Sequence, residues 1–295
     1  WKLELAMINL WYEESYWAHT GGRLSGPEMV VKNLIKSLDL KKIDYSINEN
    51  VYPNNFLVQY NENARRKKMN LADNSCLIGP QIWPFDSICK DLIEELQSYK
   101  RIISPSQWNK DWYMKKFYLP DEKVGVWPVG IDIPNNVRNI QYDCLLYYKR
   151  RSAEELEIVE KFLKKKKLTY KILQYGSYTE DQFLEMANQA NFCFLLNGTE
   201  SQGIAVQQIM SLGVPLFVWD VESWDDMGEL WSCPASSVPY WDERCGEKFY
   251  KKTMLSRTFT KFNKKLKEGE FDPKSYVKEN LSLERSAEIL LDLFK

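Results

Sequence analysis

Histidine is nearly absent from this sequence of 295 residues, in which His19 is the single one. An excess of one charge is also lacking, since 40 Lys and Arg stand against 41 Asp and Glu. A general nucleic-acid coat needs a basic excess, so we expect no nucleic-acid partner. No apolar run approaches the length of a membrane span, and no signal peptide is recognisable. The sequence begins at Trp1 rather than Met and leaves open what precedes it.

Cysteines are few and lack the spacing of a metal site. The six are Cys76, Cys89, Cys144, Cys193, Cys233 and Cys245. Those at 76, 144 and 193 lie inside apolar, strand-like runs, where cysteine usually acts as a small buried hydrophobic residue. Nothing in the sequence requires a disulfide between positions 233 and 245. Reduced thiols predict a cytoplasmic protein.

Two short basic clusters, residues 65–68 and 164–167, interrupt the neutral background. The simplest interpretation is a loop and a helix end that face water. A basic rim of this kind would also suit an acidic acceptor or an anionic membrane surface. Peripheral contact with a membrane is therefore left open.

The most informative stretch runs from Asn197 to Asp220 and has the pattern of a loop, a helix and a strand. The apolar run before it, residues 192–196, predicts a buried strand. Apolar residues at helical spacing follow from Ile204 to Leu212, and a glycine and a proline end them. Such units build parallel sheets covered by helices. Ligands bind at the carboxyl ends of these strands, against helix N-termini, so residues 200–203 are the leading candidate site.

This stretch resembles the signature of the retaining GT-B glycosyltransferases of family 4. Their signature has a glutamate, a glycine-containing turn, a second glutamate eight positions on and a small-Gly-x-Pro ending. Glu200 matches the first glutamate, Gly203 the turn, and residues 211–215 the ending, but Gln208 stands where the second glutamate would be. The resemblance implies that Glu200 holds the hydroxyls of the transferred sugar. It also implies that Gln208 accepts hydrogen bonds from the ribose of the nucleotide.

The resemblance implies an α/β fold of GT-B architecture, with two Rossmann-like domains whose parallel sheets face each other across a cleft. Residues 128–132, Pro-Val-Gly-Ile-Asp, are similar to the end of the first domain in many family members. The polar, Asn-rich stretch that follows is a natural linker. We therefore expect an acceptor-side domain over 1–134, a linker over 135–141 and a nucleotide-sugar donor domain over 142–295. Within the donor domain we expect residues 248–267 to be largely helical and 283–294 to form a final helix.

A basic triplet, residues 149–151, follows the apolar run 144–148 at the start of the expected donor domain. Cations at the N-terminus of a helix oppose the helix dipole, and this conflict favours an anionic partner. The resemblance implies that Arg150, with Lys149 beside it, neutralises the donor diphosphate. The second lysine of the family is absent, because acidic residues stand at 154 and 155.

Glycines lie in two further candidate loops. Gly21 and Gly22 separate the first expected strand from the first helix, where glycines let backbone amides approach an anion. By the resemblance this loop faces the phosphates and sugar of the donor, whereas a plain flexible loop is the alternative. Gly176 belongs to a loop, residues 175–178, that the resemblance places near the nucleotide base. His19, close to the glycine pair, is a candidate acid–base residue or ligand contact.

Sugar transfer requires that the leaving diphosphate is neutralised and that the sugar and the acceptor oxygen are held in place. Backbone amides near the glycines at 21, 22 and 203 would help Lys149 and Arg150 to neutralise the diphosphate. Ser201, Gln202 and Ile204 complete the loop that we expect to bind the donor. We expect no cofactor and no metal, because the acidic cluster 220–226 lies outside the strand-end context of an Asp-x-Asp metal motif. No Ser/His/Asp or Cys/His arrangement indicates a covalent nucleophile.

We therefore expect a metal-independent, retaining glycosyltransferase of glycan biosynthesis. Its donor is a nucleotide-sugar, UDP- or GDP-linked, and its acceptor is a glycan, a lipid-linked sugar or a protein. Retaining members of the family show no obvious protein base, so the leaving phosphate takes the acceptor proton. One alternative is a nucleotide-sugar 2-epimerase of the same fold, although that chemistry uses additional acids and more than one histidine. The other is a sugar-nucleotide binding protein without catalysis, which Gln208 and the missing lysine favour.

Overall fold

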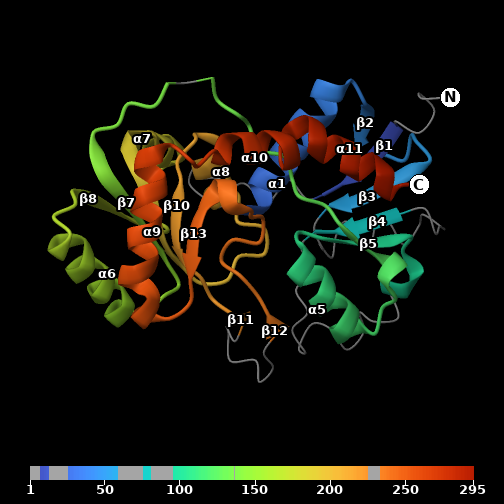
Figure 1. Cartoon of the computed structure of the whole chain (residues 1–295). Helices are drawn as coiled ribbons and strands as arrows, with labels where there is room; N and C mark the ends of the chain where they lie inside the picture. Colours follow the sequence, from blue (N-terminus) through green and yellow to red (C-terminus); the bar gives the residue numbers. More distant parts are fainter. Residues whose placement is uncertain (1–6, 13–25, 59–75, 81–95, 136, 225–232) are drawn as a thin grey trace. The chain divides into compact units, whose positions relative to one another are not determined.

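The computed structural model describes residues 7–12, 26–58, 76–80, 96–135, 137–224 and 233–295. The chain divides into two compact units, one made of Trp1–Gly130 with Leu283–Lys295 and the other of Ile131–Ser282. Each unit contains one large parallel sheet covered by helices (Figure 1). The predicted α/β class, with two Rossmann-like sheets, is confirmed.

The sheet of the first unit has six strands in the order β2-β1-β3-β4-β5-β6, and every neighbouring pair is parallel. The strands are short, and β1, β3, β4 and β5 are almost fully buried, as strands between two helical layers are, whereas the edge strand β2 is partly exposed. Their bounds are β1 Met7–Trp11, β2 Asp44–Ile47, β3 Asn54–Val58, β4 Cys76–Gly79, β5 Arg101–Ser104 and β6 Val124–Val126.

Three helices and one short 3₁₀ turn of the first unit are described. They are α1 Gly26–Lys41, α5 Gln107–Phe117, η2 Asp121–Lys123 and, from the end of the chain, α11 Leu283–Leu293. Helix α11 packs against α1, where Lys41 forms an ion pair with Glu288 at 2.6 Å. The indole of Trp127, fully buried, donates to the backbone oxygen of Ser286 at 3.0 Å. The last helix therefore belongs to the first unit, whereas the sequence analysis had assigned residues 142–295 to the second.

The sheet of the second unit has five parallel strands in the order β13-β10-β9-β7-β8. Their bounds are β7 Tyr142–Lys149, β8 Tyr170–Gln174, β9 Ala190–Asn197, β10 Leu216–Trp219 and β13 Gly246–Phe249, and a small antiparallel pair is formed by β11 Ser223–Trp224 and β12 Cys233–Pro234. Strand β8 lies on one side of β7 and β9 on the other. The strand order therefore reverses between β7 and β9, which makes this the topological switch point of the sheet.

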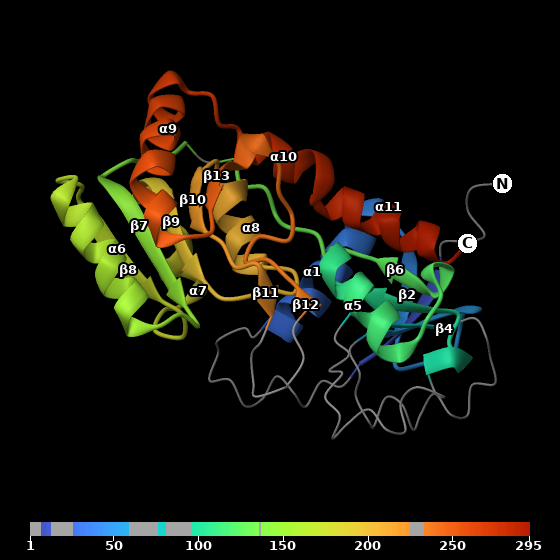
Figure 2. The same cartoon turned by 60° about the horizontal axis from the view of Figure 1, so that its bottom comes forward.

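Helices cover both faces of the second sheet (Figures 1 and 2). On one face lie α6 Ala153–Lys165 and α9 Leu255–Glu268, whose phenylalanines pack on those of the strands. On the other face lie α7 Glu180–Gln189, α8 Ile204–Ser211 and α10 Pro273–Asn280. Ser152 is the N-cap of α6 and forms a capping box with Glu155. Two 3₁₀ turns, Glu243–Cys245 and Lys252–Met254, complete the unit.

The expected helix over 248–267 is partly wrong. Strand β13 occupies Gly246–Phe249 and pairs with β10, and α9 begins only at Leu255. Gly246 has φ +145°, and a Cβ on it would lie 1.8 Å from the backbone oxygen of Leu216. Strand β13 therefore depends on a glycine and on a neighbouring strand, neither of which produces an apolar run in the sequence.

The five described cysteines, all except the one at position 89, are buried free thiols. This agrees with the expected reduced state, and positions 233 and 245 are not paired. Within the part of the chain that the structure describes, no helix is both long and apolar enough to cross a bilayer.

Candidate functional site

The candidate site lies where β7 and β9 end side by side. In the parallel register Lys149, the last residue of β7, stands opposite Asn197, the last residue of β9. The amide of Gly198 extends the ladder and donates to the backbone oxygen of Lys149 at 2.9 Å. A Cβ at Gly198 would lie 3.0 Å from the backbone oxygen of Arg150, so the two loops are in close contact at this glycine. Both loops leave the carboxyl edge of the sheet at its switch point, where ligands of open α/β sheets bind.

Lys149 and Glu200 form an ion pair at this edge. Their side chains are 12% and 13% exposed, so the pair is only partly hydrated. The amide of Asn197 donates to the same carboxylate at 2.7 Å, and the backbone amide of Glu200 donates to Ser236 at 3.1 Å. The Lys149 ammonium also lies 4.3 Å from the centre of the Tyr175 ring. Glu200 is thus held by two side chains and by its own backbone.

Three aromatic side chains, Tyr147, Tyr178 and Phe183, pack together near this ion pair. The hydroxyls of Tyr147 and Tyr178 lie 3.1 Å apart, and the rings of Tyr178 and Phe183 stack at 5.4 Å. Burial raises the pKa of Tyr147 far above its usual value, and the neighbouring Tyr178 and the Glu200 carboxylate raise it further. Tyr147 therefore stays protonated at every physiological pH and acts as a neutral hydrogen-bonding group.

The N-terminus of α8 follows Glu200 directly. Gly203 is its N-cap, with φ +79° and ψ 48°, a left-handed conformation that favours glycine. Gln202 is buried, and its side-chain amide donates to the Gln207 side-chain oxygen at 3.1 Å, while the Gln207 amide donates to the backbone oxygen of Gln202 at 3.0 Å. Ser201 is exposed and Ile204 is half-buried. Gln202 therefore shapes the turn, and Ser201 with the free backbone amides of the first helical turn is left to meet a ligand.

Gln208, which stands in place of the family's second glutamate, lies on α8 and donates to the Glu180 carboxylate on α7 at 3.1 Å. The site therefore has a carboxylate near position 208 after all, but it comes from a different helix. Gly176, with φ +99°, belongs to the turn that carries Tyr175, and both are exposed. The loop 175–178 thus ends at the site through Tyr175 and Tyr178.

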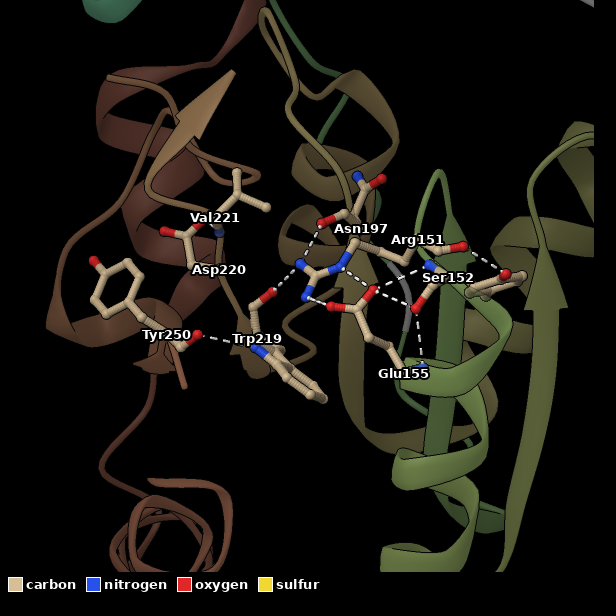
Figure 3. Close-up of polar contacts among 9 residues, drawn as sticks. Arg151, Ser152, Glu155, Asn197, Trp219, Asp220, Val221 and Tyr250 are labelled. Atoms are coloured by element: carbon tan, nitrogen blue, oxygen red, sulfur yellow. Dashed lines mark hydrogen bonds and ion pairs between the residues drawn. The ribbon is translucent and has the colours of Figure 1, made fainter. Parts of the chain in front are cut away.

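Arg150 and Arg151 follow Lys149 in the chain and line a pocket together with Gly198 and Thr199. Figure 3 shows the Arg151 guanidinium between Glu155 and the backbone oxygens of Asn197 and Trp219. Arg150 is exposed, has φ +51° and lines a neighbouring pocket of about 650 Å³. The basic triplet is therefore divided, with Lys149 at Glu200 and Arg151 in a structural role.

The buried carboxylate of Asp220 has its own partners. It accepts hydrogen bonds from Ser236 and from the backbone amide and hydroxyl of Ser237, at 2.7–3.0 Å. Lys248 lies 3.4 Å away. Among the described residues, no group of three or more His, Cys, Asp and Glu side chains is placed to hold a metal ion. His19, Gly21 and Gly22 lie outside the described residues.

Sequence reasoning missed four side chains that build the site, namely Asn197, Glu180, Tyr147 and Tyr178. Asn197 had been treated as a turn residue, although it ends a buried strand and is itself buried. Its amide oxygen has no hydrogen-bond partner among the described residues, although the atom is buried. A polar residue at the end of an apolar run was the available signal. The other three depend on packing between α7, α8 and β7.

No family model matches the sequence, and a search of curated proteins finds no significant match. Among solved structures, the chain is similar to the apo form of the lipopolysaccharide outer core galactosyltransferase WaaB, with a TM-score of 0.60 and 10% identity over 97% of this chain and 98% of that one. It is also similar to sucrose-phosphate synthase from Thermosynechococcus elongatus, with a TM-score of 0.61 and 11% identity over 98% of both chains. A third similar structure is the pneumococcal O-GlcNAc transferase GtfA in complex with UDP and GlcNAc, with a TM-score of 0.52 and 10% identity over 81% and 56%.

Identities this low show the fold alone. The fold is the GT-B fold that the resemblance predicted, and it covers nearly the whole chain. Two of the three similar proteins are transferases of sugars by name.

Proposed function

We propose that the chain is a glycosyltransferase that moves a sugar from a nucleotide-diphosphate donor to a hydroxyl acceptor, with retention and without a metal ion. One observation carries the proposal. Lys149, at the end of β7, and Glu200, in the loop that follows the neighbouring strand β9, meet at the switch point of the second sheet, beside the N-terminus of α8. The GT-B fold of the similar structures, including one that holds UDP and GlcNAc, supports it.

The donor diphosphate is assigned to Lys149 and the first turn of α8. Free amides of a helix N-terminus and a lysine together favour a dianionic group. When the sugar–phosphate bond breaks, negative charge grows on the leaving phosphate, and prearranged donors of this kind stabilise it. Arg150 lines the neighbouring pocket, so we assign it a lesser role than the resemblance implies.

Glu200 is assigned to the sugar. Its carboxylate accepts from Lys149 and Asn197 in this structure. A bound diphosphate would draw the Lys149 ammonium toward itself and free one acceptor position on Glu200 Oε1, the oxygen that Lys149 shares with Asn197, for a sugar hydroxyl. Asn197 keeps its hydrogen bond and holds the carboxylate in place meanwhile. In the exchange Lys149 stays paired with an anion, and the Glu200 carboxylate stays hydrogen-bonded, with and without donor.

In the transfer step the bond from the anomeric carbon to the phosphate oxygen breaks and the bond to the acceptor oxygen forms on the same face. The acceptor proton passes to the departing phosphate oxygen, so no protein base is required. UDP and GDP sugars are the expected donors, and the acceptor is a glycan, a lipid-linked sugar or a protein. A lipid-linked acceptor would bring the protein to a membrane surface.

The rival proposal is a sugar-nucleotide binding protein without transfer activity. The replacement of the second glutamate by Gln208, whose amide is bonded to Glu180, favours it. The two proposals share the donor site and differ in turnover. A nucleotide-sugar 2-epimerase of the same fold would convert the donor sugar with no acceptor present.

A thermal-shift panel of UDP, GDP, ADP, TDP and CDP, each with and without magnesium, tests the donor site. A ligand that binds only the folded state adds about 2.7 kcal/mol at a hundredfold excess over Kd. We expect one nucleotide to stabilise the wild type, Lys149→Met to remove most of the effect and Arg150→Ala to reduce it less. Lys171→Met is the matched control, because Lys171 also lies over a tyrosine ring, 4.6 Å from that of Tyr142, but donates to Gln189 and forms no ion pair with a carboxylate among the described residues. If none of the nucleotides raises the melting temperature of the wild type, the proposal is overturned.

A further inference from the structure

Helices α6 and α9 both end in runs of lysine. Residues 161–167 contain five lysines and residues 261–267 contain four, and neither segment contains an aspartate or a glutamate. The whole chain is nearly neutral, with 40 basic and 41 acidic residues. The positive charge at these two helix ends is therefore a local accumulation and not a property of the chain as a whole.

The two runs, residues 161–167 and 261–267, form one surface, which we call the lysine face. Helices α6 and α9 lie side by side on the same face of the second sheet, and the rings of Phe162 and Phe259 pack edge to face between them at 5.1 Å (Figures 1 and 2). The ammonium of Lys166 lies 5.7 Å from the Phe162 ring and 5.9 Å from the Phe259 ring. The end of α6 thus reaches across to α9.

The lysine face lies at the amino edge of the sheet, opposite the carboxyl edge that carries the candidate donor site. The backbone oxygen of Thr169, just beyond α6, accepts from the amide of Cys144 near the start of β7. On α9, Lys261 and Lys265 each lie 2.9 Å from the carboxylate of Glu247, near the start of β13. The charge of these lysines is therefore not part of the donor site.

The lysines outnumber the acidic side chains that pair with them. Five of the nine form ion pairs, but these pairs use only four glutamates, at positions 157, 160, 247 and 268. Four of the paired lysines are still between 61% and 74% exposed, and exposed pairs of this kind contribute little to stability. Lys165, Lys167 and Lys267 are exposed, and their side chains form no hydrogen bond or ion pair with any residue that the structure describes. The fold itself does not use this excess of positive charge.

Lys167 occupies a position that glycine would fit better. It has φ +57° and lies in the turn that ends α6, where its amide donates to the oxygen of Lys164 and the amide of Leu168 donates to that of Leu163. Helix α9 ends in the same turn, but there the residue is Gly269, with φ +70°. A side chain in this left-handed conformation costs free energy that glycine does not. The backbone therefore does not explain the lysine, which adds an exposed charge.

The side chains of the lysine face favour a diffuse anionic surface over a single bound phosphate. Arginine, whose planar group binds phosphate in a bidentate manner, is absent from both segments. Lysines are flexible point charges, and each one close to an anionic membrane adds to the attraction. Leu168, after α6, and Phe271, after α9, are half-buried beside the lysines and provide apolar contact with the headgroup region.

We propose that the lysine face binds the anionic phospholipids of a membrane surface, so that the second unit docks through the ends of α6 and α9. The inference goes beyond the proposed function, because the lysine face is separate from Lys149 and Glu200 and needs no donor. Many weak contacts carry the binding and no single lysine is indispensable. The attraction is electrostatic, so salt screens it.

Co-sedimentation of the full chain with lipid vesicles tests the proposal. The vesicles consist of phosphatidylcholine alone or of phosphatidylcholine mixed with phosphatidylglycerol, at low and at high sodium chloride. We expect binding to the mixed vesicles only, and loss of most of it at high salt. The triple variant Lys165→Gln, Lys167→Gln, Lys267→Gln should weaken the binding about tenfold or more, because it removes three unpaired charges.

Lys167→Gly and Lys42→Gly form a matched pair that separates charge from folding. Lys42 ends α1 in the same turn, with φ +54°, is also exposed and lies in the first unit. Each substitution removes one lysine from a left-handed position, so both variants should melt no lower than the wild type. Only Lys167→Gly should weaken vesicle binding, by about fivefold. A variant that is as stable as the wild type but binds less shows that the charge carries the binding.

Three results would overturn the proposal: no binding to the mixed vesicles, equal binding to phosphatidylcholine alone, and unchanged binding by the triple variant. A short DNA duplex or polyglutamate that binds the same lysines more tightly than the mixed vesicles, at the same concentration of negative charge, would also overturn it. Failure of the nucleotide panel would leave the lysine face unaffected, because the two experiments address opposite edges of the sheet.

Discussion

Lys149 and Glu200 are 51 residues apart in the sequence and form an ion pair at the adjacent carboxyl ends of β7 and β9. The pair is nearly enclosed, and Asn197 bonds the same carboxylate. The contact exists because β9 lies beside β7, with Asn197 in register with Lys149. It joins the two charges that the proposed reaction needs, one for phosphate and one for sugar hydroxyls.

The coupling between Lys149 and Glu200 is the first prediction. A double-mutant cycle of Lys149→Met and Glu200→Gln should give a coupling energy of about 0.5–3 kcal/mol, because each single variant leaves a partly enclosed group without its partner. Chemical unfolding of the four proteins measures it. The two singles should also differ in nucleotide binding, which is lost in Lys149→Met and kept in Glu200→Gln. Strict additivity would show that the ion pair contributes nothing to stability.

Restoring the family's second glutamate should be unfavourable in this chain. Gln208→Glu would place a carboxylate against that of Glu180, to which the Gln208 amide now donates at 3.1 Å. We expect the single variant to lose about 0.5–2 kcal/mol of stability, and the double variant Gln208→Glu, Glu180→Gln to recover most of it, since the hydrogen bond is then reversed. Thermal unfolding at pH 7 compares the three proteins. A single variant as stable as the wild type would mean that the two side chains move apart freely.

The contribution of Glu155 should depend on pH. Burial would raise its pKa, but hydrogen bonds from Arg151 and Ser152 and the charge of Arg151 outweigh burial and lower the pKa below its usual value. A pKa that is lower in the folded state means that the stabilisation is fully present above the unfolded pKa of about 4.3 and is lost as pH falls through the folded pKa. Glu155→Gln should therefore cost roughly 1–3 kcal/mol at pH 7 and progressively less below pH 4.

Glu154→Gln is the matched control for that experiment, because the neighbouring Glu154 is exposed and makes none of these hydrogen bonds. Its effect should be smaller at pH 7. Urea unfolding of the wild type and both variants between pH 3 and pH 8 tests the prediction. A Glu155→Gln deficit that stays constant over this range would exclude a depressed pKa as its cause.

The glycine that begins β13 should tolerate no side chain. Gly246→Ala places a Cβ 1.8 Å from the backbone oxygen of Leu216 at a φ of +145°, so the pairing of β13 with β10 must be disrupted. We expect a loss of about 3 kcal/mol or more, from backbone strain and lost strand pairing. Gly26→Ala is the control, since a Cβ there meets nothing within 4 Å. Differential scanning fluorimetry of both variants suffices, and equal melting temperatures would contradict the predicted clash.

The sequence predicted the strands and helices whose pattern of apolar and turn residues is contained in a few neighbouring positions. Apolar runs predicted β7, β9 and β10, and helical spacing predicted α8. The Ser152–Glu155 capping box likewise depends on neighbours only three residues apart. Strand β13 was missed, because its sequence Gly-Glu-Lys-Phe has no apolar run and is extended only by pairing with β10.

The sequence by itself determined the fold class, the strand-loop-helix unit around Glu200 and the loop that carries the candidate site, because periodicity and turn residues act over a few positions. Only the tertiary structure decided which residues meet there. It brought Lys149 to Glu200, supplied Glu180 as the partner of Gln208 and joined the last helix to the first unit. These contacts follow from the order of strands and the packing of helices, and such long-range neighbours are not encoded in any local pattern.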